Sequence, residues 1–178
     1  MDIKTAQKDM RTAYYGGGTG ALVSGTVWLM AGVLAYAAEP RTAIIAFLIG
    51  GMFIFPLSAG LDKLLGRSGK HAKDNPLGPL ALEGTVMMML GILIALATLY
   101  SGLQLFFPAM LMVIAGRYLT FGTLYGMKLY WVFAAALAVA GFIIFRWGLP
   151  FYSGGLIGGV IEIVFAFLLM AGSKRMDA

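Results

Sequence analysis

Hydrophobic residues along the chain gather into six long blocks, which short polar segments separate. Each block holds about 20 residues, the length a helix needs to cross the hydrocarbon core of a bilayer. None alternates as a β-strand does, and an isolated strand could not satisfy its backbone groups in lipid. The pattern therefore predicts an all-α, polytopic bundle of six transmembrane helices over residues 17–38, 42–61, 80–100, 104–125, 129–147 and 152–171.

The composition leaves room for little besides this bundle. Of the 178 residues, 60% are hydrophobic and 12% are charged, about half the charged fraction of a soluble domain. We therefore expect residues 1–178 to form a single transmembrane domain. The first apolar block is longer than the core of a signal peptide, so we expect it to be a retained helix.

The distribution of Lys and Arg predicts the orientation of the bundle. Ten of these 13 residues fall in the N-terminal tail, the loop at 62–79, the turn after residue 125 and the C-terminal tail. Only Arg41 and Arg146 fall on the opposite side. By the positive-inside rule, we expect both termini and the 62–79 loop in the cytoplasm, and the protein in the cell membrane.

Aromatic residues near the block ends are typical of the belts that line membrane–water interfaces. We expect this role for Tyr14, Tyr15, Tyr36, Tyr100, Tyr125, Tyr130, Trp131, Trp147 and Tyr152.

Three ionisable residues lie inside predicted spans: Glu83, Arg117 and Glu162. Intramembrane charges are costly, so they usually face the bundle interior and pair. Counting helical rise from the outer face puts Arg117 and Glu162 at similar depth, which favours Glu162 as the partner over Glu83. The sequence leaves two interpretations open, a polar substrate site and a purely structural ion pair. Tyr118 and Trp28 are the other interior candidates for this site, with core packing as the alternative for each.

Glycines recur at four-residue spacing in the first and last blocks, at Gly16 and Gly20 and at Gly154 and Gly158. Such spacing lets helices approach closely. We expect these glycines to serve packing within the bundle, with a homo-oligomer interface as the alternative.

The basic 62–79 loop is expected to face anionic lipid headgroups. We expect neither nucleic acid as a partner nor a cofactor. The chain has no cysteine and one histidine, His71, so no metal site is predicted. A serine nucleophile would lack a histidine base within the bundle. We therefore expect no enzymatic activity and assign no catalytic residue.

Three stretches, Gln7–Gly32, Arg67–Leu82 and Gly116–Trp131, resemble a family of small bacterial six-helix membrane proteins of unknown function. The resemblance covers nearly the whole chain and implies a bacterial cytoplasmic membrane. It supplies no functional residues.

Two function classes follow from these patterns. The first is a small transporter or ligand-binding bundle with a buried Arg/Glu site. The alternative is an accessory or scaffold protein that associates through its glycine-rich helix faces and basic loop. A water-accessible interior would favour the first, and a dry core would favour the second.

Overall fold

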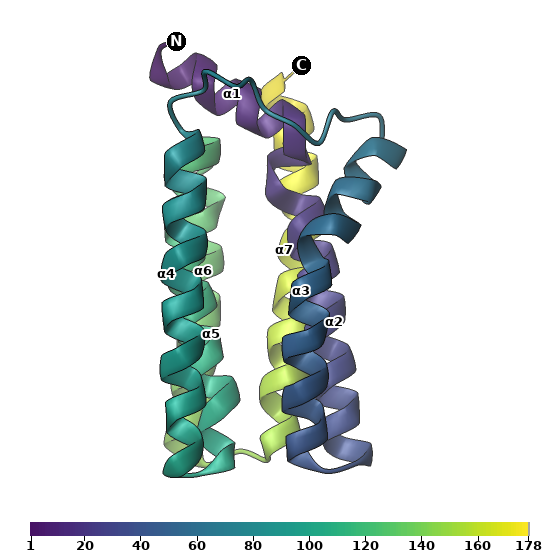
Figure 1. The fold of residues 1–178 in the computed structure, drawn as a ribbon, viewed down its shortest axis with the longest axis vertical. Coiled ribbons are helices and arrows are strands. Elements are labelled where there is room, and N and C mark those ends of the chain that lie inside the picture. Colours follow the sequence, from purple (N-terminus) through teal and green to yellow (C-terminus); the bar gives the residue numbers. More distant parts are fainter. Residues whose placement is uncertain (178) are drawn as a thin grey trace.

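The computed structural model describes residues 1–177, which fold into seven α-helices and three short 3₁₀ turns, with no strand among these residues. Six of the helices lie roughly parallel and are long and apolar enough to cross a membrane, as the hydrophobic pattern predicted (Figure 1). The helices are α1 (Ile3–Tyr14), α2 (Gly18–Ala37), α3 (Pro40–Leu64), α4 (Gly78–Ala97), α5 (Phe106–Tyr125), α6 (Leu129–Trp147) and α7 (Phe151–Asp177).

The seventh helix, α1, replaces the N-terminal tail expected from the sequence. It lies across the end of the bundle that also holds the C-terminus (Figure 1). Ala6, Met10 and Ala13 are spaced four and three apart and are all buried, so α1 packs one apolar face against the bundle. Asp2 begins the helix by accepting a hydrogen bond from the Thr5 amide (2.9 Å), as an N-cap does.

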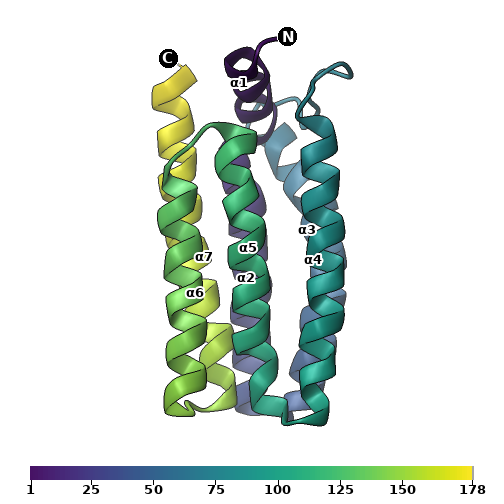
Figure 2. The ribbon, with the colours of Figure 1, turned by 90° about the vertical axis from the view of Figure 1, so that its left-hand side faces the viewer.

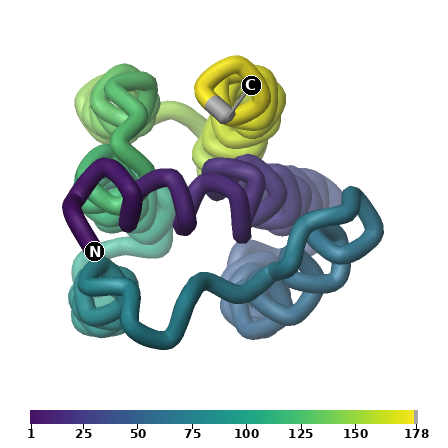
Figure 3. Tube along the Cα trace, turned by 90° about the horizontal axis from the view of Figure 1, so that it is seen from above, coloured from purple at the N-terminus to yellow at the C-terminus, as the bar shows by residue number. Residues whose placement is uncertain are grey.

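Seen along its length, the bundle has two rows of helices (Figure 3). One row contains α6, α5 and α4, which lie side by side in Figure 2. In the other, α2 packs between α7 and α3. The rows meet mainly where α7 packs against α6 and α5, whereas α3 and α4 make little contact with one another.

Glycines hold α2 and α7 close together, but on a different stripe from the one predicted. Gly18, Gly25 and Gly32 are seven residues apart and all face α7. A Cβ built on Gly32 would lie 2.6 Å from the Leu156 amide nitrogen, and one on Gly25 would lie 3.0 Å from the Gly159 carbonyl oxygen. This packing leaves no room for any side chain at these positions.

The glycines predicted to pack divide into two groups. Cβ atoms on Gly154 and Gly158 would meet Phe107 and Trp28 within 3.0 Å, so both glycines face the bundle interior. Gly16 is also buried. Gly20, in contrast, has nothing within 4 Å of its built Cβ, so the expectation that it packs against a neighbouring helix is wrong.

Residues 65–77 join α3 to α4 by crossing the same end of the bundle, where they bind α1. The Asp9 carboxylate accepts hydrogen bonds from the Ala72 amide (2.9 Å) and from Asn75 Nδ2 (2.7 Å). Tyr14 is hydrogen-bonded to His71 (2.8 Å). The loop and α1 together form a cap on this end of the bundle. The loop's expected contact with lipid headgroups stays a prediction.

The cap also reaches the end of α5. Gln7 Nε2 donates to the Thr123 carbonyl (2.7 Å), and Arg11 Nη1 donates to the Tyr125 carbonyl (2.8 Å). These carbonyls belong to the last turn of α5, where no further helical amide is available. The side chains of α1 thus supply hydrogen bonds to two carbonyls at the end of a helix long enough to span a membrane.

Candidate functional site

Two consecutive residues of α5 point toward different neighbours. The turn of about 100° per residue in a helix separates Arg117 from Tyr118. Arg117 faces α4, where its Nη1 donates to the Met88 sulfur (2.6 Å). Tyr118 is buried and donates from its hydroxyl to Glu162 Oε1 of α7 (3.1 Å). The same turn of α5 therefore places the Arg117 guanidinium against α4 in its own row and the Tyr118 hydroxyl against α7 in the other row.

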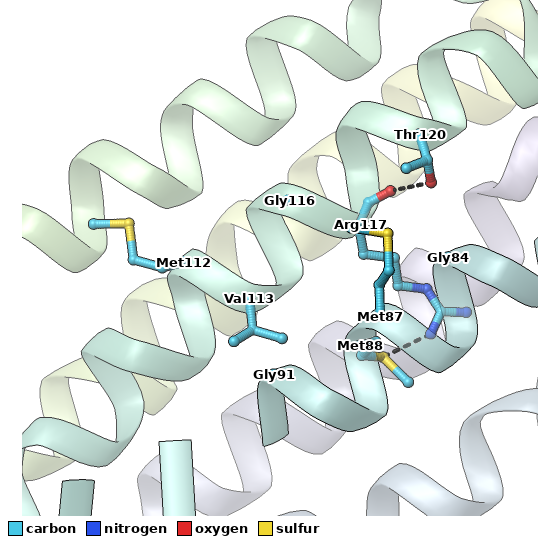
Figure 4. A pocket seen from close by; sticks show the side chains of 9 residues that line it. All are labelled: Gly84, Met87, Met88, Gly91, Met112, Val113, Gly116, Arg117 and Thr120. Atoms are coloured by element: carbon cyan, nitrogen blue, oxygen red, sulfur yellow. Dashed lines mark hydrogen bonds between the residues drawn. The ribbon is translucent and has the colours of Figure 1, made fainter. Parts of the chain in front are cut away.

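The Arg117 guanidinium lies among apolar groups. Besides the Met88 sulfur, it is near the Phe121 ring, with Cζ 5.3 Å from the ring centroid. Its backbone carbonyl accepts the Thr120 hydroxyl (2.7 Å), as Figure 4 shows. Within residues 1–177, no carboxylate forms an ion pair with this guanidinium.

A cavity of about 190 Å³ opens beside Arg117 between α4 and α5. Figure 4 shows the lining residues, which are small or flexible and mostly apolar: Gly84, Met87, Met88, Gly91, Met112, Val113, Gly116, Arg117 and Thr120. A second cavity, of about 360 Å³ between α5 and α6, shares Met112 and Gly116 with the first and is otherwise lined mainly by alanines. Of these two cavities, the one beside Arg117 has the charged wall.

Glu162 lies at the centre of the bundle and is fully buried. Its Oε1 accepts the Tyr118 hydroxyl, and Ser24 of α2 approaches the same carboxyl group. Its Oε2 has no hydrogen-bond partner among the described residues. Since buried polar atoms are nearly always hydrogen-bonded, this oxygen sets Glu162 apart from the other buried side chains that the structure describes.

The expected ion pair between Arg117 and Glu162 is not formed, although the two groups are close enough to interact electrostatically. The difference lies in the direction of the two side chains. Arg117 leaves α5 toward α4, whereas Glu162 approaches α5 on the face that carries Tyr118.

Glu83 and Trp28 also lie outside the polar site that the sequence suggested. Glu83 is exposed on α4 and has no hydrogen bond or ion pair within the described chain, so it is not a buried partner. Trp28 is buried, but it packs against Phe47 (4.6 Å between ring centroids) and Phe107 (5.7 Å) in an apolar cluster. Of the five candidates, the structure brings together Tyr118 and Glu162 directly and Arg117 at their edge.

An aromatic cluster that sequence reasoning missed surrounds Tyr118. Tyr125 and Tyr130 were expected at the membrane interface, but both are buried. Tyr130 donates its hydroxyl to the Gly16 carbonyl (2.7 Å), and Tyr118 stacks on Phe133 (4.1 Å between centroids). The sequence did contain a signal for this cluster. One helix face carries three aromatic residues spaced three and four apart, Tyr118, Phe121 and Tyr125.

The residues that could bind a metal ion are not clustered in the part of the chain that the structure describes. Within residues 1–177, no group of three His, Cys, Asp or Glu side chains could hold a metal ion. His71 is in the cap, hydrogen-bonded to Tyr14 and far along the chain from Glu162.

Six apolar spanning helices around a buried polar centre define a multi-pass integral membrane protein. More specifically, the chain belongs to the family of unknown function DUF7010, whose family model matches residues 3–172. No curated protein and no solved structure matches it significantly.

Proposed function

We propose that this protein is a small membrane transporter whose Arg117 binds an anionic solute. The observation that carries the proposal is the Arg117 guanidinium, which belongs to a membrane-spanning helix, borders a cavity and has no carboxylate partner among the described residues.

The energetics favour a ligand at this position. An arginine at the centre of a bilayer costs at least about 2.5–3.5 kcal/mol on insertion scales, and intramembrane charges are therefore usually paired. A thioether sulfur and a phenyl ring compensate a full positive charge only weakly. A carboxylate, sulfonate or phosphate could instead form two parallel hydrogen bonds with the guanidinium.

The arrangement of the helices supports a coupling between this site and the rest of the bundle. Tyr118 follows Arg117 directly and contacts Glu162 of the other row. A ligand that moves Arg117 would therefore also disturb the contact between rows at their centre. We infer that transport proceeds by a movement of one row against the other, with Tyr118 and Glu162 at the sliding contact.

The proposed setting is a bacterial cytoplasmic membrane with both termini in the cytoplasm. This orientation is supported by the ten Lys and Arg residues near one end of the bundle, against two near the other. The scaffold alternative receives less support, since the faces of Gly154, Gly158 and Gly25 are already occupied within the bundle.

Cysteine chemistry offers a direct test because the native chain has no cysteine. Met88→Cys puts a thiol beside the guanidinium, and Leu90→Cys puts one on an exposed part of the same helix as a control. Both variants would be labelled in intact membranes with two thiosulfonate reagents, one bearing a sulfonate and the other a trimethylammonium group. Each measurement would be repeated in Arg117→Gln and Arg117→Lys backgrounds.

We expect the sulfonate reagent to label Cys at position 88 at least about fivefold faster than the cationic reagent, a ratio equivalent to roughly 1 kcal/mol. The preference should persist with Lys at position 117 and disappear with Gln, while the control at position 90 shows none. Labelling at position 88 as slow as at position 90, with either reagent, would mean that lipid fills the cavity. The transporter proposal would then be rejected.

A further inference from the structure

A second group of positive charges lies at the capped end of the bundle, around the ring of Tyr15. The Arg67 guanidinium carbon is 4.4 Å from the ring centroid, and the Lys174 ammonium nitrogen is 5.7 Å from it. Arg67 belongs to the loop after α3 and Lys174 to the last turns of α7. One aromatic ring therefore gathers cations from two distant parts of the chain.

The backbone at Tyr15 is held in an unusual conformation that positions this ring. Its φ of 52° is the only positive value at a non-glycine residue within residues 1–177. Such a conformation is costly for a residue with a Cβ and persists only where the surroundings enforce it. Here it occurs at the junction between α1 and α2, where the chain turns from the cap into the bundle.

No carboxylate among residues 1–176 forms an ion pair with either cation. The acidic group that interacts with Arg67 is Asp62, but its side chain is buried and its Oδ1 accepts the Thr19 hydroxyl (2.7 Å). Lys174 is exposed and Arg67 is half-buried, so both can be approached from the end of the bundle. Two positive charges share a ring and are open to a ligand.

We propose that Arg67 and Lys174, held by Tyr15, bind the phosphate group of an anionic phospholipid. A guanidinium can donate two parallel hydrogen bonds to phosphate oxygens, and an ammonium adds a point charge. Basic groups at the ends of membrane helices meet the headgroup layer, where such phosphates lie. The inference rests on Tyr15 and its two cations and does not depend on the role of Arg117.

The test compares cations that contact the ring with cations that do not. The ring-contacting variants are Arg67→Gln, Lys174→Gln and the double variant. Lys70→Gln, in the same loop, and Arg175→Gln, next to Lys174, make the same charge change at exposed positions. Each full-length protein in detergent would be titrated with phosphatidylglycerol and with phosphatidylcholine, with the bound lipid counted by native mass spectrometry. Inorganic phosphate would be added as a competitor.

We expect each ring-contacting substitution to weaken phosphatidylglycerol binding about fivefold, with the loss of one surface cation corresponding to about 1 kcal/mol. The two controls should stay within about twofold of the native chain. Arg67→Lys should retain most of the binding, which separates loss of charge from loss of fold. Displacement by millimolar inorganic phosphate would assign the site to a soluble phosphate, and its failure would assign it to the lipid. Equal weakening by all four single Gln substitutions, or equal affinity for phosphatidylcholine, would overturn the proposal.

Discussion

The contact between α2 and α7 makes a quantitative prediction for Gly155→Ala. A Cβ at this position would lie 2.5 Å from Gly32 Cα and 2.6 Å from the Gly32 nitrogen. Carbon atoms in favourable contact are about 3.5–4.0 Å apart, so the new methyl group is roughly 1 Å too close. Its neighbours are backbone atoms, which no rotamer change can move. The two helices must therefore separate locally.

The magnitude follows from two opposing effects. Overpacking in a well-packed interior costs about 1–3 kcal/mol, while replacing glycine by alanine inside a helix recovers up to about 1 kcal/mol. We expect Gly155→Ala to lower the free energy of unfolding by about 1–2 kcal/mol. Gly51→Ala in α3 is the matched control, because nothing lies within 4 Å of its built Cβ. That substitution should be neutral or stabilise by up to about 1 kcal/mol.

Reversible unfolding in mixed micelles of a mild detergent and dodecyl sulfate would measure both changes, with helicity followed by circular dichroism. The difference between the two variants should be about 2 kcal/mol, because the propensity gain is common to both. If Gly155→Ala and Gly51→Ala had the same stability within error, close packing of α2 on α7 would not be a source of stability. The reasoning from the glycine contacts would then be refuted.

Two further substitutions test the central hydrogen bond and the cap. Tyr118→Phe removes the donor to Glu162 and should destabilise the bundle by about 1–3 kcal/mol in the same assay. A Tyr118→Phe, Glu162→Leu double variant should recover part of this loss, and additive effects would contradict a direct interaction. Asn75→Leu removes the hydrogen bonds to the Ala6 carbonyl and to Asp9, so amide exchange in residues 69–77 should accelerate at least about tenfold. Unchanged exchange there would show that this side chain does not hold the cap.

The six spanning helices could be predicted because lipid imposes length and apolarity on every segment that crosses it. The same criterion missed α1, which is short and has only one apolar face. Its burial depends on residues 65–77 and on the end of α5, partners that no local pattern identifies.

Side-chain direction was the main limit on predicting the site. The depth of a residue can be counted along its helix, but the sequence does not say which helices are neighbours. Arg117 and Glu162 were therefore paired by depth alone. Tyr125 and Tyr130 were misassigned for a related reason. A tyrosine near a helix end suits both an interface and a buried hydrogen bond, and the Gly16 carbonyl that Tyr130 binds lies more than one hundred residues away.

The close fit of α2 and α7 also has a consequence for how the protein is made. Helices enter a membrane in the order of their synthesis, and α2 precedes α7 by four intervening spanning helices. The glycine face of α2 therefore stays unpacked in the bilayer until α7 has been inserted. Glu162 arrives on that last helix, so the polar centre is completed at the final step of assembly. A nascent chain that stalls before α7 would lack both the packing partner of the α2 glycine face and the Glu162 carboxyl group. We expect membrane quality control to remove such a chain.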